Sequence, residues 1–273
     1  TLHVPPFQLI QELLDWVETA EANDTSTNIW QMLFVSDGSE LHKMMSYGWV
    51  LSTPTGTRLA RCYGPASGPN TSHRAEATGM LAASRFLLRL SQFCNCHQQW
   101  HVRYVSDNQG LITRATDRLK YAHSYPNATL APDWDLVEEI HATNAILKAT
   151  ASYQHVLGHQ DRHKQYDDLP LDAQLNVEAD EEAGYFQSMH ATVMRPKVPL
   201  LPSTKAQLHI GDQTITGHYP TAIRLAAAEP DLRAYIQERN EWDETHMDSI
   251  LWPALKTSIS RNYHPHVPVV KLT

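Results

Sequence analysis

Four acidic residues stand in separate segments of the chain, and each lies in or directly after a segment with a regular pattern. Carboxylates brought together raise each other's pKa unless cations compensate their charge. Hard oxygen ligands select Mg²⁺ or Mn²⁺ over zinc, and two such ions suit in-line hydrolysis of a phosphodiester. A shared site would therefore bind two divalent metal ions. Its candidate residues are Asp37, Glu76, Asp107 and Asp180.

Asp37 is expected at the end of a buried strand. Residues 30–36 form a short apolar run, and turn-forming residues follow it at once, which is typical of a strand that leaves the sheet there. Gly38 would let the backbone turn without a Cβ clash. The simpler alternative is that Asp37 only serves this strand-end turn.

The other three carboxylates are expected on two helices and one strand end. Glu76 lies in the first turns of an apolar helix that Thr71 or Ser72 can cap. Asp107 follows a strand over 101–106, and a helix over about 109–119 comes next. Asp180 lies inside a helix predicted from 171 to about 189.

The order of these elements predicts a mixed sheet. Strands over 30–36, 47–52 and 57–63 are joined by short connections, which indicates an antiparallel meander. Strands over 101–106 and 152–156 then alternate with helices, including one over 134–147. We therefore expect an α/β fold with a mixed five-stranded sheet, three antiparallel strands followed by parallel additions, and helices on both faces.

The flanking segments differ in character from this core. Residues 5–23 have apolar positions at helical spacing, which predicts a helix there. Three prolines follow Arg195 within seven residues and predict a linker. A hairpin around Gly211 and helices over about 218–240 and 244–260 are expected near the end. The predicted division is 1–28, an N-terminal helix and linker; 29–190, the catalytic domain; 191–205, a linker; and 206–273, a small α+β annex.

The order of the motifs resembles the ribonuclease H family, and most of all the ribonuclease H region of reverse-transcriptase-type retroelement polyproteins. Asp37 stands in an SDGS segment, Glu76 in RAE, Asp107 in SDN, His159 in a GHQD loop and Asp180 in NVEAD. The specific motifs cover residues 31–187. The resemblance implies a ribonuclease H-like fold and cleavage of the RNA strand of RNA–DNA hybrids, leaving 5′-phosphates, beside a reverse transcriptase domain.

The same resemblance implies a role for individual residues. Asp37 would bridge two Mg²⁺ ions, for which Mn²⁺ can substitute; Glu76 and Asp107 would complete one, and Asp180 would hold the other. His159 would assist proton transfer or product departure. Ser39, Asn108 and Ser72 are also ordinary turn or cap residues. The residues implied in substrate binding are Gly38, Ser39, Ser72, Arg74, Asn108, Gln109 and Asn176.

The net charge and the length of the apolar runs argue against two classes of protein. The net charge is −8, with only 22 Lys plus Arg, which argues against a protein that coats nucleic acid by bulk electrostatics. Phosphate contacts are expected from Arg74, Arg103, Arg114 and Arg118. No apolar run approaches the ~20 residues of a membrane span, and no signal peptide is visible, so an intracellular location is expected.

Cysteine and histidine clusters offer weaker metal hypotheses. Three cysteines make no disulfide framework and favour a reducing compartment. The segment 94–97, Cys-Asn-Cys-His, has no second cysteine pair to complete a zinc site. His155, His159 and His163 straddle a strand and a loop, so a shared metal is not expected.

Two other functions remain open at this stage. A DNA-cutting member of the same superfold, such as a transposase, integrase or resolvase, would share the architecture. A catalytically inactive scaffold or connection module would share it too, and its melting temperature would not respond to Mg²⁺ or Mn²⁺.

Overall fold

The computed structural model describes residues 13–17, 29–41, 44–95, 99–123, 127–189, 197–204, 206–211 and 213–249. The chain divides into two compact units, Thr1–Tyr219 and Pro220–Thr273. The four candidate acids, Asp37, Glu76, Asp107 and Asp180, all lie in the first unit.

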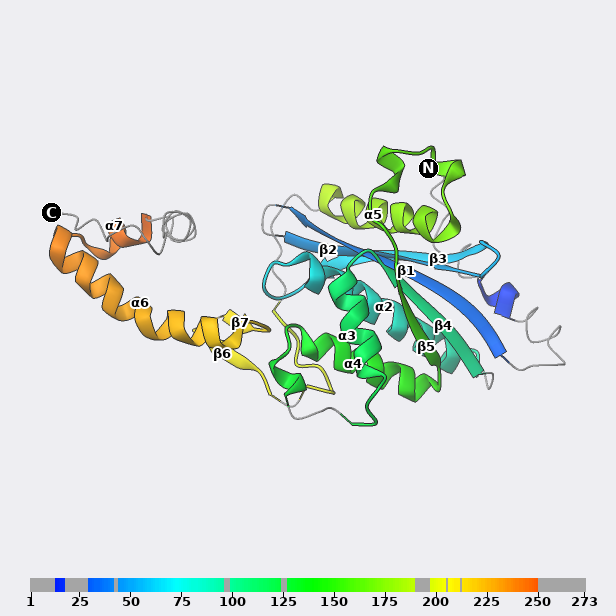
Figure 1. Cartoon of the computed structure of the whole chain (residues 1–273), viewed down its shortest axis with the longest axis horizontal. Helices are drawn as coiled ribbons and strands as arrows, with labels where there is room; N and C mark the ends of the chain where they lie inside the picture. The colour runs from blue at the N-terminus through cyan, green and yellow to red at the C-terminus, as the bar shows by residue number, and fades with distance from the viewer. Residues whose placement is uncertain are drawn as a thin grey trace, which may run out of the picture. The chain divides into compact units, whose positions relative to one another are not determined.

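A mixed five-stranded sheet forms the centre of the first unit (Figure 1). Its strands run in the order β3-β2-β1-β4-β5. β1 pairs antiparallel with β2 and parallel with β4, β2 pairs antiparallel with β3, and β4 pairs parallel with β5. The strands are β1 Ile29–Leu41, β2 Met44–Ser52, β3 Arg58–Ala66, β4 Gln99–Ser106 and β5 Thr150–His155. The ribonuclease H-like architecture predicted from the sequence is confirmed by this order and pairing.

Helices cover both faces of the sheet. Figure 1 shows α5 on one face and α2, α3 and α4 on the other. Their bounds are α2 Ser72–Phe93, α3 Gln109–Arg118, α4 Trp134–Leu147 and α5 Leu171–Met189. Short 3₁₀ turns, η1 Ala128–Leu130, η2 Gln160–Arg162 and η3 Tyr166–Asp168, lie in the connections.

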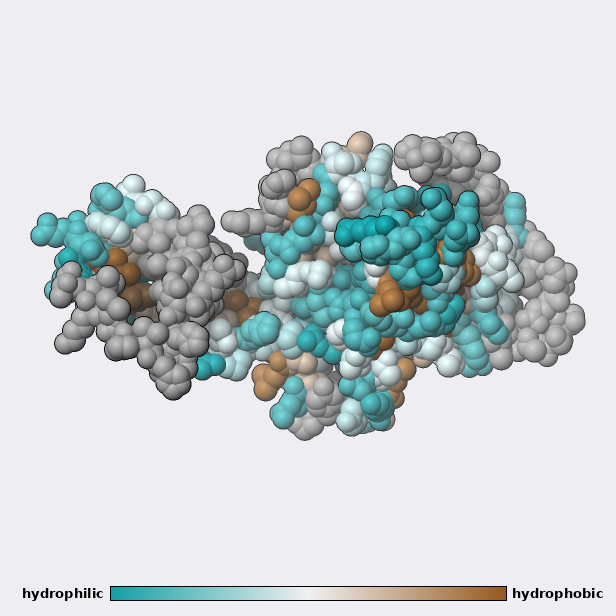
Figure 2. Space-filling model, turned by 45° about the horizontal axis from the view of Figure 1, so that its top comes forward, coloured by the Kyte–Doolittle hydropathy of each residue, from teal (hydrophilic) through white to brown (hydrophobic). Residues whose placement is uncertain are grey.

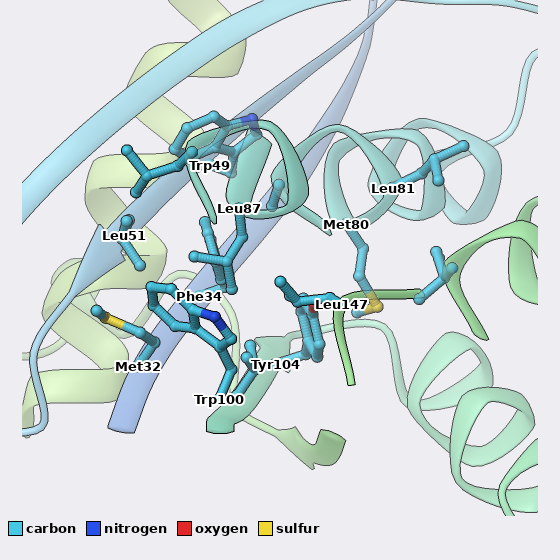
Figure 3. Close-up of a cluster of buried hydrophobic side chains, with 14 of the residues drawn as sticks. Met32, Phe34, Trp49, Leu51, Met80, Leu81, Leu87, Trp100, Tyr104 and Leu147 are labelled. Atoms are coloured by element: carbon cyan, nitrogen blue, oxygen red, sulfur yellow. The ribbon is translucent and has the colours of Figure 1, made fainter. Parts of the chain in front are cut away.

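The central strand β1 is buried on both sides, which explains its unbroken apolar run. Met32 and Phe34 face the larger core, together with Trp100, Tyr104 and the α2 side chains (Figure 3). Leu33 and Val35 face the other way and pack against α5 residues such as Ala173 and Ala179. Packing on two faces fixes the position of β1, and with it the position of Asp37.

The expected turn after Asp37 does not exist. β1 continues to Leu41, Asp37 pairs with Gly48, and the parallel pairing with β4 stops earlier, at Val35 and Val105. A Cβ on Gly38 would lie 2.5 Å from the Glu76 main-chain nitrogen. Gly38 is therefore needed because α2 approaches the strand closely, and continued pairing with β2 overrides the turn preference of the SDGS segment.

The flanking elements are only partly described. Leu13–Val17 is helical, and the rest of the helix predicted over 5–23 lies outside the described residues. β6 (Leu208–Ile210) and β7 (Gln213–Ile215) form the expected hairpin, which belongs to the first unit rather than to the unit with the C-terminal helices.

The second unit is described over α6 (Tyr219–Asn240, which begins one residue earlier) and α7 (Glu244–Ser249). The remainder of the helix predicted over 244–260 lies outside the described residues. Among the helices that the structure describes, none has the length and apolar character that a membrane crossing requires.

Gly48 on β2 lies where α5 packs closely against the sheet. A Cβ there would lie 2.1 Å from the main-chain oxygen of Ala179, so α5 would have to move away from β2. Gly48→Ala should lower the free energy of unfolding by about 3 kcal/mol, the upper range for overpacking. Urea unfolding measures the change.

The matched control for this test is Gly184→Ala, because Gly184 lies within α5 and nothing stands within 4 Å of its missing Cβ. That variant should gain up to about 1 kcal/mol from helix propensity. Equal midpoints for Gly48→Ala and the unmodified protein would contradict the close packing of α5 on β2.

Candidate metal centre

Three carboxylates meet at one edge of the sheet. Asp37 on β1, Glu76 on α2 and Asp107 after β4 each offer a ligand oxygen, and these atoms all lie within 4.8 Å of one another. Asp37 is only 5% exposed and Glu76 only 3%. An all-oxygen donor set of this kind fits Mg²⁺ or Mn²⁺. We call these three residues the carboxylate trio.

The Glu76 side chain is held in place by its neighbours. Ser106 donates a hydrogen bond from Oγ to Glu76 Oε2, and Asn108 donates from Nδ2 to Glu76 Oε1 at 3.2 Å. Asn108 also caps α3, because its Oδ1 accepts from the main-chain N–H of Leu111 at 3.1 Å. The start of α3 and the orientation of Glu76 are thus fixed by the same residue.

Asp107 is positioned from β5 by two contacts that the sequence analysis did not identify. His155 Nε2 lies 3.0 Å from the main-chain oxygen of Asp107. The backbone at Gly158 passes so close that a Cβ there would lie 2.2 Å from Asp107 Oδ2. The glycine beside His159 was a visible signal, whereas His155 was considered only as a metal ligand.

Asp180 and His159 lie beside the trio and are more exposed. The Asp180 side chain is 46% exposed and the His159 side chain 50%, and His159 Nδ1 lies 3.8 Å from Asp180 Oδ2. The charge of Asp180 still raises the pKa of Asp37. Asp180 is therefore near the trio electrostatically, on its solvent side, although it does not share the 4.8 Å cluster.

The electrostatics of the site require compensation. Burial raises the pKa of Asp37 to about 9, with added repulsion from Asp107, Glu76 and Asp180. Burial also raises the pKa of Glu76 to about 8, against the hydrogen bonds from Ser106 and Asn108. The pKa of Asp180 is raised by burial, while His159 acts to lower it. The trio therefore cannot be fully ionised at neutral pH without a cation.

The expected substrate-binding residues lie on or next to the elements that carry the four carboxylates. Ser72 and Gln109 are exposed at the first positions of α2 and α3, and Asn108 is half-buried. Ser39 donates from Oγ to Gln187 Oε1 at 3.2 Å. Asn176 is buried, and its Oδ1 has no hydrogen-bond partner among the described residues.

Arg74 contradicts the expectation that it contacts substrate. It is 1% exposed, and its guanidinium donates to Asp133 Oδ1 at 2.8 Å and to both Asp135 oxygens at 2.9 and 3.1 Å. These contacts join the start of α2 to the start of α4. Arg74 is a buried structural residue, so the prediction of a substrate role was wrong.

The other three arginines expected to bind phosphate are engaged as well. Each makes side-chain contacts with protein groups that occupy its guanidinium. The pairs are Arg103 with Asp172, Arg114 with His73 and the Pro132 main-chain oxygen, and Arg118 with Glu138.

No protein-family model and no curated relative matches the sequence. Among solved structures, the N-terminal ribonuclease H domain of a Mycobacterium tuberculosis protein, fused to maltose binding protein, is 17% identical; the alignment covers 59% of this chain and 96% of that one, with a TM-score of 0.41.

Two further solved structures have similar sequence identities and TM-scores against this chain. LC11 ribonuclease H1 from compost, solved with an RNA/DNA hybrid, is 13% identical over 59% of this chain and 99% of that one, with a TM-score of 0.43. The prototype foamy virus protease-reverse transcriptase is 16% identical over 60% of this chain and 22% of that one, with a TM-score of 0.40. The fold assignment rests instead on this chain's own strand order and pairing.

Removal of the Arg74 charge should destabilise the protein strongly. Arg74→Met leaves the buried Asp135 without its cation and leaves Asp133 with only His73 and Thr216, and the loss of such a buried pair costs about 3–5 kcal/mol. The control is Arg61→Met, because the pair of Arg61 with Glu182 lies at the surface and should contribute less than about 1 kcal/mol. Urea unfolding of both variants checks this, and equal losses would contradict the structural role.

The pKa of Asp37 predicts an unusual response to pH. Without metal, the folded state keeps a proton on Asp37 up to about pH 9, whereas the unfolded chain releases it near the ordinary value of 3.8. The folded state therefore binds more protons in this window, and stability falls as pH rises through it. Asp37→Asn removes the carboxyl group whose proton gives the protein this dependence of stability on pH.

The melting temperature of Asp37→Asn, measured in EDTA, should rise relative to the unmodified protein as pH increases from 5 to 8. Asp117→Asn is the control, because Asp117 pairs with Lys120 at the surface. A difference between Asp37→Asn and the unmodified protein that does not change with pH would show that Asp37 ionises freely.

Proposed function

We propose that this protein is a divalent-metal-dependent endonuclease that hydrolyses the RNA strand of RNA–DNA hybrids beside a reverse transcriptase domain of a retroelement polyprotein. The carboxylate trio carries the proposal, since three acids within 4.8 Å of one another, two of them buried, require cations to be ionised together. The ribonuclease H-like sheet and the motif order around Asp37, Glu76, Asp107 and Asp180 support it.

The trio and Asp180 would hold Mg²⁺ or Mn²⁺. When bound, such ions supply the charge that activates water and stabilises the leaving 3′ oxygen in phosphodiester hydrolysis. The chain's own contribution is orientation: Ser106 and Asn108 fix Glu76, the pairing of β1 with β2 fixes Asp37, and His155 fixes the backbone of Asp107. A fixed ligand set loses little entropy when it meets the scissile phosphate.

His159 is suited to proton transfer at the solvent side of the site. It is half exposed and lies 3.8 Å from Asp180, so a proton can pass between the imidazole and water while the carboxylate stays close. A histidine can accept and donate protons near neutral pH. We assign His159 to proton transfer to the departing product.

Selection of a hybrid requires contacts that distinguish RNA from DNA. The 2′-hydroxyl is that signature, and it both donates and accepts hydrogen bonds. Ser72 and Gln109 are exposed at the starts of two helices that also present Glu76 and Asn108. We propose these side chains, with the backbone at Gly38 and Ser39, as the reading groups. Asn176, also expected in substrate binding, is only 2% exposed, so its amide does not reach a substrate in this structure.

A cleavage assay tests the function directly. Labelled RNA–DNA hybrid, RNA duplex and DNA duplex are incubated with the full chain in Mg²⁺ or Mn²⁺. Only the hybrid should be cut, and Asp37→Asn should lower the rate by about 10³-fold or more, since metal-borne charge stabilisation is worth several kcal/mol. Asp117→Asn should cut at the unmodified rate.

Two results would replace the proposal with another function. Preferential cutting of the DNA duplex would favour a DNA-processing enzyme of the transposase, integrase or resolvase type. No cutting together with a melting temperature that Mg²⁺ and Mn²⁺ leave unchanged would favour an inactive scaffold, because a ligand bound only by the folded state raises its stability.

A further inference from the structure

An acidic protein that binds a polyanion needs local cations near its site. Phosphate contacts supply most of the affinity in nucleic-acid binding. The four arginines expected to provide them are paired within the fold, as described above. Three more, Arg58, Arg61 and Arg85, pair with glutamates at its surface. The substrate must therefore meet other cations.

The loop between β5 and α5 presents two such cations. This loop carries His159, and η2 and η3 lie within it. Arg162 and Lys164 are exposed, and among the residues that the structure describes neither side chain makes a hydrogen bond or an ion pair. They follow His159 by three and five positions, in the loop whose His159 lies beside Asp180.

The loop forms a shaped surface. A hollow of about 660 Å³ is lined by the residues from Asp161 to Gln165 together with Asp168. Among the coloured residues in the view of Figure 2, hydrophilic ones predominate over scattered hydrophobic ones. Asp161 and Asp168 balance the charges of Arg162 and Lys164 among these lining residues. The two cations would therefore act on one or two phosphates of a backbone locally, and not through the net charge of the hollow.

The loop backbone is held by its own hydrogen bonds and by one tyrosine. The Arg162 N–H donates to the His159 oxygen at 3.3 Å, and the Lys164 N–H donates to the Gln160 oxygen at 3.2 Å. The Tyr166 hydroxyl donates to Glu178 on α5 and accepts from Arg58 on β3. A fixed backbone presents the two cations at a fixed distance from the site.

The position of the loop next to Asp180 is supported by the contacts of His159. His159 Nδ1 lies 3.8 Å from Asp180 Oδ2, and the Arg162 N–H donates to the main-chain oxygen of His159 at 3.3 Å. The backbone that carries Arg162 is therefore tied to the residue that lies beside Asp180. A phosphate held there would lie beside the trio and not on a remote surface.

We propose that Arg162 and Lys164 form a phosphate-binding element that takes the sugar–phosphate backbone of the nucleic acid next to the carboxylate centre. This inference rests on the proposed function, because it names the contacts through which that substrate is held. It assigns backbone affinity to the loop and leaves recognition of RNA to the groups at the starts of α2 and α3.

The test is an equilibrium binding titration. Full-length Asp37→Asn protein, which should not consume its substrate, is titrated in Mg²⁺ with fluorescent RNA–DNA hybrid at several salt concentrations. Adding Arg162→Gln and Lys164→Gln should raise Kd by about tenfold at 0.1 M salt and lower the slope of log Kd against log salt by about 1 to 2. Arg162→Lys with Lys164→Arg should restore both values.

The matched control is Lys148→Gln. Lys148 is also exposed, but it precedes β5, whereas the loop follows the other end of that six-residue strand, ~20 Å away. This variant should leave Kd and slope unchanged. Equal effects of Lys148→Gln and the loop variants, or no effect of the loop variants, would overturn the inference.

Binding and cleavage separate the two proposals. Hybrid binding that is lost in the loop variants, without any cutting by the unmodified protein, would support the loop and refute the nuclease function. Specific cutting with an unchanged Kd in the loop variants would refute the loop alone. Failure of the Asp37→Asn protein, and of the unmodified protein in Mg²⁺, to bind hybrid would refute both.

Discussion

The closeness of three carboxyl groups, two of them buried, is the constraint on which the first unit depends. Asp37, Glu76 and Asp107 lie within 4.8 Å of one another, and the burial of Asp37 and Glu76 strengthens the repulsion between the ionised forms. The three groups stay together because each is anchored to a different part of the fold: a central strand packed on both faces, a buried helix, and a strand end held from β5. Without a cation, protons on the buried acids limit the repulsion, since the pKa of Asp37 is raised to about 9 and that of Glu76 to about 8. Bound cations would take the place of those protons.

Glycines make this closeness geometrically accessible. Gly38, Gly48 and Gly158 each stand where a Cβ would come within 2.5 Å of another group: the Glu76 backbone, the Ala179 oxygen and the Asp107 carboxylate. None of the three has a positive φ angle. Their role is to let α2, α5 and the His159 loop approach the sheet edge, which is a different use of glycine from the turn that the sequence suggested.

The sequence was a good guide wherever a signal is local. The apolar periodicity placed the helices over 134–147 and 171–189 at their observed bounds, and the order of strands gave the sheet. It failed where a distant partner decides. The pairing of Asp37 with Gly48 overrode a local turn signal, and Arg74 finds its carboxylates about 60 residues away. A paired arginine and a phosphate-binding arginine look alike in a sequence, because only the fold shows which acids are near.

The pairing of most arginines within the fold limits how strongly the proposed enzyme would bind nucleic acid. Its arginines mostly hold the frame together, as Arg74 and Arg118 do between helices, and few cations face the site. Affinity for a free hybrid should then be modest and only weakly dependent on salt, since few counterions are released. A polymerase domain in the same polyprotein that already grips the hybrid would raise its effective concentration at the centre. Weak intrinsic binding would therefore be compatible with efficient cutting in the proposed arrangement, and it would keep such a nuclease from being retained on nucleic acid that the proposed polymerase domain has not engaged.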